Sequence, residues 1–181
     1  MSERELATLC SRSDRSACRE LYMRYAARVF ALCLRYTNDR AEAEDLMHDT
    51  MIKVYGAIGR FSYKGEGSLY SWIRSIAVHL AIDLIRKNNA QIIGSLDENE
   101  IQIADEASDS QREIPFRILS EMITTLPQTQ RLIFNLYCIE GFSHKEIADL
   151  LGIKMKTSSS LLAKAKKRLN VMVEQYLKAK G

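Results

Sequence analysis

The sequence predicts an all-α protein in which two small helical domains are joined by an acidic, flexible linker. Three observations lead to this prediction. The 181 residues include only two prolines and eight glycines, and residues with high helix propensity are abundant. Apolar residues recur at intervals of three and four along most of the chain. The net charge of +3 is uneven, because residues 1–90 carry +3, residues 91–115 carry −6 and residues 116–181 carry +6. We therefore expect domains at 1–90 and 116–181, with the linker at 91–115 between them.

Composition also excludes several classes of protein. No apolar run approaches the roughly 20 residues that a membrane-spanning helix requires, and the charged, polar start does not resemble a signal peptide. Four cysteines have neither paired spacing nor histidines nearby; they are Cys10, Cys18, Cys33 and Cys138. We expect them to be small, reduced core residues, with no metal site and no cofactor. These features predict a cytoplasmic protein that does not insert into a membrane.

The first 36 residues are expected to form one or two helices. Ser13 and Asp14 are a plausible break and cap. After them an apolar stripe continues for several turns through Ala17, Leu21, Tyr25, Val29, Leu32 and Tyr36. Three arginines lie off this stripe, and their default position is a solvated face; they are Arg24, Arg28 and Arg35.

The next helix is expected from Arg40 to about Ile58. Asp39 and Glu42 have the spacing of a capping pair. One face of the helix is apolar and consists of Ala43, Leu46, Met47, Thr50 and Val54. Another face is largely acidic and consists of Glu44, Asp45, His48, Asp49 and Ile52. An acidic face can serve solubility or can dock on a basic partner, and spacing alone favours solubility.

A glycine-punctuated segment follows, with two aromatic residues and two cations between its glycines. Aromatic rings interleaved with cations suit unpaired bases, through stacking and phosphate contact. The alternative is a loop held on the core by Phe61. The two interpretations are compatible if Phe61 anchors the loop on the core while Tyr63 and Lys64 are exposed.

Residues 68–88 are expected to form one long helix with two stripes. Ile73, Ala77, Leu80 and Leu84 are predicted to face inward. A second stripe contains Trp72, Ile76, His79 and Asp83. A tryptophan in such a stripe is more often a core residue than a wedge in DNA, and a single histidine is more often structural than a ligand.

The C-terminal domain is expected to begin with helices over 116–126 and 128–139, followed by a helix-turn-helix. Ser143 and Glu146 form a capping box, Ala148 is small enough for a close helix crossing, and Gly152 suits a left-handed C-cap. The second helix has apolar residues spaced by four, at Leu161, Ala165 and Leu169, and it is basic. The alternative is an αα-hairpin with a solvated basic face. Ser158 occupies an inward position that is usually apolar in such motifs, so we expect looser packing there.

Three stretches together resemble bacterial RNA polymerase sigma factors of the extracytoplasmic-function (ECF) group. Ala43–Met51 is similar to region 2.2, Ser71–Lys87 to regions 2.3 and 2.4, and Leu126–Leu169 to region 4. The resemblance implies a non-enzymatic factor that binds core polymerase, directs it to promoters and opens the DNA. It raises docking above solubility for the acidic face, and implies contact of Glu44, Asp45, His48 and Asp49 with the β′ clamp helices.

The same resemblance implies two sets of DNA-binding residues. Minus-ten contacts are expected from Phe61, Tyr63, Lys64, Ser68, Trp72, Arg74, His79 and Arg86. Minus-thirty-five contacts are expected from Lys156, Thr157, Ser159, Ser160, Lys164, Lys167 and Arg168. His48, His79 and Leu161 depart from the usual family residues, which are Gln, Asn and a basic residue. Further implied partners are the β flap and an anti-sigma factor, often membrane-bound.

Other classes of protein explain fewer of these features. A response regulator with a C-terminal helix-turn-helix would need a receiver of alternating strands and helices, and residues 1–90 contain no β-rich run. An enzyme would need a P-loop, a nucleophile elbow or a metal-ligand spacing, and none is present in the sequence. A helical interaction module would explain the acidic helix but neither the aromatic loop nor the basic recognition helix.

Overall fold

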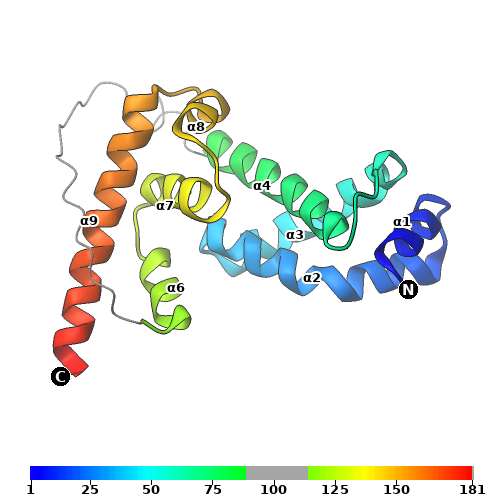
Figure 1. Ribbon diagram of the computed structural model, residues 1–181, viewed down its shortest axis with the longest axis horizontal. Coiled ribbons are helices and arrows are strands. Elements are labelled where there is room, and N and C mark those ends of the chain that lie inside the picture. Colours follow the sequence, from blue (N-terminus) through cyan, green and yellow to red (C-terminus); the bar gives the residue numbers. More distant parts are fainter. Residues whose placement is uncertain (89–113, 181) are drawn as a thin grey trace. The chain divides into compact units, whose positions relative to one another are not determined.

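The computed structural model describes residues 1–88 and 114–180. These residues fall into two compact units, Met1–Lys87 and Asn88–Gly181, which are described separately (Figure 1). Every regular element in the described ranges is helical, which confirms the predicted fold class. Most of the predicted linker lies outside the described residues.

The first unit contains four α-helices and a short 3₁₀ turn. They are α1 (Glu3–Ser11), α2 (Arg15–Thr37), α3 (Arg40–Ala57), η1 (Ile58–Arg60) and α4 (Ser68–Asn88). The predicted break after α1 is present, because Asp14 caps α2 by accepting from the Ala17 N–H. Asp39 caps α3 in the same way. Short polar side chains that satisfy first-turn donors therefore set these helix starts.

The core of the first unit follows the predicted stripes of α2 and α3 closely. Leu21, Val29 and Val54 are almost fully buried. On α4, Ile73 and Ala77 are also buried as predicted, but Leu80 and Leu84 are only half-buried. The buried side of α4 continues instead through Val78, Ala81, Ile82 and Ile85. This helix is apolar on more than one side, so periodicity alone did not determine which side packs inward.

The second unit contains α6 (Phe116–Thr124), α7 (Gln128–Phe134), α8 (His144–Leu151) and α9 (Met155–Lys180). The predicted capping box is present, with both Ser143 and Glu146 bonded to each other's backbone N–H. Gly152 ends α8 in the left-handed region at φ 68°, where a Cβ would be strained. One core cluster joins α6 and the turn that follows it to α9, through Ile123, Leu126, Ala165 and Leu169.

The predicted continuous helix over 128–139 is interrupted. After α7 the backbone widens into a π-helical turn, η2 (Asn135–Ile139), in which the Glu140 N–H donates to the Asn135 carbonyl at 2.9 Å. A wider turn shifts the register of the residues that follow, and Tyr137 and Cys138 are exposed. The expectation that all four cysteines are core residues is therefore wrong for Cys138, although Cys10 and Cys33 are buried.

Candidate functional sites

The first candidate site is a groove of about 280 Å³ between α3 and α4, here called the acidic groove. It is lined by Glu42, Asp45, Leu46, Asp49, Leu80, Asp83, Leu84 and Lys87. Four carboxylates thus lie beside three leucines, two of which are half-buried. A surface that combines carboxylates with accessible apolar area suits a helix that presents both cations and apolar side chains.

The four residues predicted to bind polymerase divide into two pairs. Asp45 and Asp49 line the acidic groove. Glu44 and His48 are exposed on α3 but do not line it, and the Glu44 carboxylate pairs with the Arg40 Nε at 3.0 Å. Sequence reasoning missed the contributions of α4 to this groove, because it did not indicate which part of α4 lies beside α3.

The second candidate site surrounds the loop between η1 and α4, and is here called the loop pocket. Its volume is about 580 Å³, and its lining is Arg60, Phe61, Ser62, Lys64, Glu66, Gly67, Ser68, Ser71 and Trp72. The rings of Phe61 and Trp72 are 5.3 Å apart between centroids, with a tilt of 46°. Ser68 Oγ donates to the Gly65 carbonyl at 2.6 Å and accepts from the Lys64 N–H at 3.2 Å. These two hydrogen bonds hold the loop against the start of α4.

The residues predicted for minus-ten contact are not all gathered in the loop pocket. Phe61, Lys64, Ser68 and Trp72 line it. Tyr63 belongs to the same loop and is 38% exposed. The other three lie further along α4, where Arg74 is half-buried and His79 and Arg86 are exposed.

Local contacts restrain some of these α4 residues. Arg86 is 4.0 Å from Asp83, and His79 Nδ1 is 2.7 Å from the Ser75 carbonyl. The loop pocket also includes Arg60, Ser62, Glu66 and Ser71, which sequence reasoning did not select. The sequence signals that could have indicated these four residues were the cation at Arg60 and the glycines of the loop.

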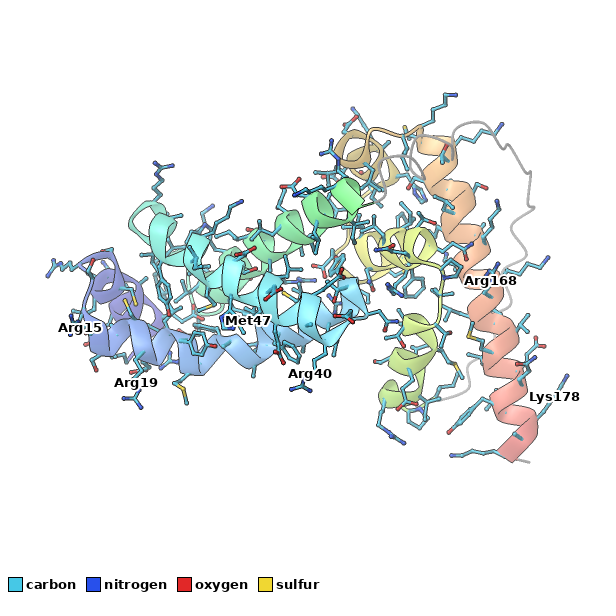
Figure 2. The ribbon with its side chains drawn as sticks, turned by 180° about the vertical axis from the view of Figure 1, so that it is seen from behind. Arg15, Arg19, Arg40, Met47, Arg168 and Lys178 are labelled. Carbon is cyan, nitrogen blue, oxygen red and sulfur yellow. The ribbon has the colours of Figure 1, made fainter. Side chains whose placement is uncertain are left out.

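The third candidate site is the solvent-facing side of α9, here called the recognition face. The buried stripe of this helix consists of Ser158, Leu161, Leu162, Ala165 and Leu169. All seven residues predicted for minus-thirty-five contact lie off that stripe, four of them exposed and Thr157, Ser160 and Lys164 half-buried. Arg168 and Lys178 extend outward from α9 in Figure 2. Because Leu161 is only 6% exposed, a cation at that position would be buried.

A polar contact replaces the loose packing that was expected at Ser158. Ser158 is completely buried, and its Oγ is 2.9 Å from His144 Nδ1 on α8. The His144 ring also stacks on Tyr137, with 4.4 Å between centroids. Burial lowers the pKa of His144, and the nearby Lys166 lowers it further. The inward position is thus filled by a hydrogen-bonded pair that ties α8 to α9.

Comparison with known proteins identifies the class of protein that this fold represents. Sigma-70 region 2 matches residues 21–91, and Sigma-70 region 4 matches residues 116–169. One match falls in each compact unit, and together the two cover more than half of the chain. The three candidate sites lie on elements within those matched residues.

Relatives agree with this class, and a solved structure agrees with the fold. The ECF RNA polymerase sigma factor SigM of Bacillus subtilis (strain 168) is 27% identical over 159 residues, covering 84% of this chain and 93% of that protein. The ECF RNA polymerase sigma-E factor of Escherichia coli (strain K12) is 25% identical over 193 residues, covering 98% and 97%. The solved structure of CnrH in complex with the cytosolic domain of CnrY has a similar fold, with a TM-score of 0.51 and 17% identity over 96% and 97% of the two chains.

The chain therefore belongs to the sigma-70 family as an ECF-group sigma factor, and it directs RNA polymerase to promoters. Sigma factors are non-catalytic initiation factors, so this protein is not an enzyme. Among the helices in the described ranges, none has the length and apolarity required to span a bilayer.

Proposed function

We propose that the two units divide promoter recognition between them. Residues 1–90 bind core polymerase and recognise and melt the minus-ten element, residues 116–181 read the minus-thirty-five element, and residues 91–115 connect the two. The observation that carries this proposal is the separation of an acidic groove from an aromatic and cationic loop pocket within one small unit. The opposite charge of these two surfaces suits a basic protein partner at one and nucleic acid at the other.

The acidic groove is the proposed docking surface for the β′ clamp helices. Asp45 and Asp49 carry most of this contact, while Glu44 and His48 lie at its edge. Leu80 and Leu84 supply apolar area that the partner removes from water, and the surrounding carboxylates set encounter rate and register. The second unit supplies the contact with the β flap.

The loop pocket is the proposed site for an unstacked base of the minus-ten element. Phe61, Tyr63 and Trp72 offer aromatic faces for stacking, and Lys64 offers a cation for the adjacent phosphate. Ser68 keeps the loop in place. Arg74, His79 and Arg86 continue the contact along α4, where the duplex upstream of the opened bases would lie.

The recognition face of α9 is the proposed reader of the minus-thirty-five element. Its front residues Lys156, Thr157, Ser159 and Ser160 are assigned to base edges in the major groove. Lys164, Lys167 and Arg168 lie further along the helix and are assigned to phosphates, which position the helix without specifying sequence.

We also propose a cytoplasmic location, where core polymerase and promoter DNA are found, and regulation by an anti-sigma factor of the kind that is often membrane-bound. The acidic groove is the surface on which such a factor would compete with polymerase. Competition predicts that core polymerase and the anti-sigma factor do not bind at the same time.

A reconstituted transcription assay tests the division of roles. The measurements are affinity for core polymerase and permanganate reactivity of thymines at a promoter selected from a random library. Asp45→Arg with Asp49→Arg should strongly weaken polymerase binding, whereas Trp72→Ala should leave binding intact and reduce thymine reactivity. The proposal is wrong if the groove variant binds polymerase normally or if Trp72→Ala opens the promoter as well as the unchanged protein.

A further inference from the structure

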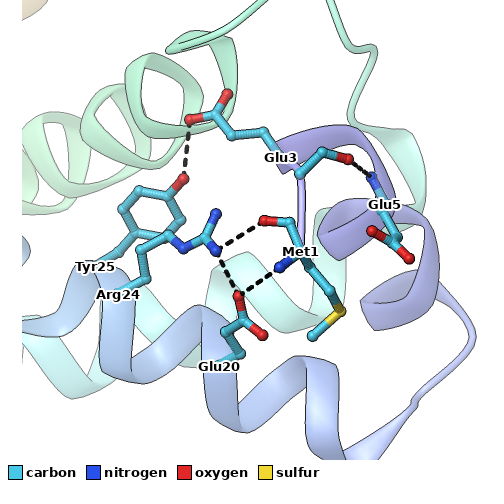
Figure 3. A network of polar contacts seen from close by, with 7 residues as sticks. Met1, Glu3, Glu5, Glu20, Arg24 and Tyr25 are labelled. Carbon is cyan, nitrogen blue, oxygen red and sulfur yellow. Dashed lines mark hydrogen bonds and ion pairs between the residues drawn. The ribbon is translucent and has the colours of Figure 1, made fainter.

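A buried carboxylate at the start of the chain links three helices of the first unit. Glu3 on α1 is only 5% exposed. Its Oε1 accepts from the Tyr25 hydroxyl of α2 at 2.9 Å (Figure 3). Its Oε2 accepts from the Leu69 N–H of α4 at 3.2 Å. Both carboxylate oxygens therefore have partners, as a buried carboxylate requires.

The contact with Leu69 is a helix cap supplied from a distant part of the chain. Leu69 is the second residue of α4, and the first N–H groups of a helix have no partner within it. Ser68 Oγ, the adjacent hydroxyl, donates to the Gly65 carbonyl of the loop. Glu3 accepts from Leu69 across 66 positions of sequence. Its carboxylate also lies at the end of α4 where the helix dipole favours negative charge.

The residue at the start of the segment that carries Glu3, Met1, is held against α2. The Met1 ammonium group lies 3.4 Å from the Glu20 carboxylate of α2. Arg24 donates to the Met1 carbonyl at 2.8 Å and pairs with Glu20. Figure 3 shows these contacts converging on the start of α1 beside α2. The position of Glu3 is therefore set by α1 and α2 together.

A second contact holds the same end of α4. The Arg28 guanidinium of α2 lies 3.7 Å from the centre of the Tyr70 ring. The Tyr70 ring in turn stacks on Tyr25, with 6.0 Å between centroids. Tyr25 is thus shared between the carboxylate of Glu3 and the ring that follows Leu69. The first turn of α4, which lines the loop pocket, is therefore held by both α1 and α2.

We propose that Glu3 is a positioning residue for the loop pocket. Leu69 lies one residue from Ser68 and three from Trp72, both of which line that pocket. Fixing the first turn of α4 holds Trp72 against Phe61 before a base arrives, so less conformational freedom is lost when the base is captured. The inference rests on the proposed melting function of the loop pocket. Glu3 precedes the residues matched by Sigma-70 region 2, which begin at residue 21.

The free protein provides the first test, without polymerase. Trp72 is the only tryptophan of the chain, so its fluorescence and acrylamide quenching report on the loop pocket directly. Glu3→Ala should increase quenching and speed amide exchange at Leu69 by about tenfold or more, because a charge-assisted hydrogen bond is lost. Glu3→Gln should retain most protection, since its amide oxygen still accepts from Leu69. Glu5→Ala, which removes an exposed acid of the same helix, is the matched control and should change neither measurement.

The second test separates positioning from general stability. With core polymerase, Glu3→Ala should lower open-complex formation on a duplex promoter by about tenfold but should act normally on a promoter with a pre-opened minus-ten bubble. Tyr25→Phe removes one hydrogen bond and keeps the ring, so it supplies a milder variant if Glu3→Ala does not fold.

Three results would overturn the inference. In Glu3→Ala, they are unchanged Trp72 quenching or an equal loss of open complex on duplex and bubble promoters. In Glu3→Gln, the result is a loss of Leu69 protection as large as that of Glu3→Ala. If the unchanged protein opens no promoter while the Trp72 and exchange changes still occur, the melting function of the pocket is wrong. The role of Glu3 in holding α4 then stands.

Discussion

The acidic groove and the recognition face both place charge on one side of a helix whose other side is buried, yet they differ in shape. The groove is concave, formed by two helices, and includes half-buried leucines. The recognition face belongs to α9 alone and presents mainly hydroxyls and cations. Charges beside apolar area that a partner can bury favour a short-range protein contact. Exposed cations along one helix instead favour phosphate binding that depends on salt.

The largest expected effect concerns the concave surface. Asp45→Arg with Asp49→Arg should weaken binding to core polymerase by at least about 2 kcal/mol, or roughly 30-fold, because both reversed charges face the partner. Helical circular dichroism should be unchanged, since both residues are exposed. The measurement is a fluorescence titration with labelled protein.

Glu44→Arg is the matched control for this prediction. Glu44 belongs to the same helix but lies outside the acidic groove, paired with Arg40. Its effect should stay within about 1 kcal/mol, as for an exposed ion pair. If Glu44→Arg weakens polymerase binding as strongly as the double variant, then the charge of α3, and not the groove, determines binding.

The next effect concerns the support beneath the recognition face. Ser158→Ala should lower the unfolding free energy of the second unit by about 1–3 kcal/mol, because the half-buried His144 Nδ1 loses its partner, the hydroxyl of the fully buried Ser158. Amide exchange in α8 and α9 measures this without interference from the first unit. Ser159→Ala, at an exposed neighbouring position, should change exchange by no more than about 0.5 kcal/mol. Equal effects would mean that the His144 contact contributes nothing to stability.

The recognition face itself should divide into two kinds of residue. Lys164→Ala should weaken binding of the holoenzyme about equally on all sequences and lower the salt slope by about one unit. Lys156→Ala or Ser160→Ala should instead change the preferred bases, by roughly 1–3 kcal/mol for a good contact. Binding-site selection at two salt concentrations measures both. A changed sequence preference for Lys164→Ala alone would mean that α9 docks differently.

The smallest expected effect is a pH dependence of the second unit. The pKa of His144 is lowered by burial and by Lys166, so below about pH 6.5 the unfolded chain binds a proton that the folded one resists. Stability should therefore fall as pH decreases from about 6.5 toward the folded pKa of His144. The lowered pKa of Glu146 acts in a separate window, below its ordinary value of 4.5.

Amide protection factors in α8, which are corrected for the intrinsic pH dependence of exchange, check this prediction at pH 7 and at a pH near 5.5. His144→Gln should remove the difference in protection between the two pH values, because Gln does not titrate. A second unit that becomes more stable on acidification would contradict the sign of the effect.

Local chemistry made much of this protein predictable. Asp14, Asp39 and Ser143 each accept from a nearby N–H, so a few neighbouring residues set the start of each helix. Leu46 and Val54 were predicted to be buried because an amphipathic helix has one apolar side. Asp45 and Asp49 were selected from the same pattern together with a family resemblance, and both line the acidic groove.

The errors fall where a residue depends on a partner that is distant in sequence or on an irregular turn. Leu80 and Leu84 had the spacing of core residues, but the packing of α4 leaves them beside the carboxylates of α3. Cys138 was expected in the core, but the π-helical turn rotates it outward. When a helix such as α4 is apolar on two sides, the sequence does not indicate which side packs inward. A π-helical turn, which adds one residue to a helical turn, also has no clear sequence signal.

The sequence by itself determined most of the helices, the caps at Asp14, Asp39 and Ser143, and the charged sides of α3 and α9, because each depends on contacts within about four residues. The tertiary structure alone decided that α4 completes the acidic groove, that His144 is hydrogen-bonded to Ser158, and that Glu3 caps a helix 66 positions away. The physical reason is that these contacts form between surfaces brought together by burial of apolar area. That driving force is non-directional and leaves no fixed spacing in the sequence.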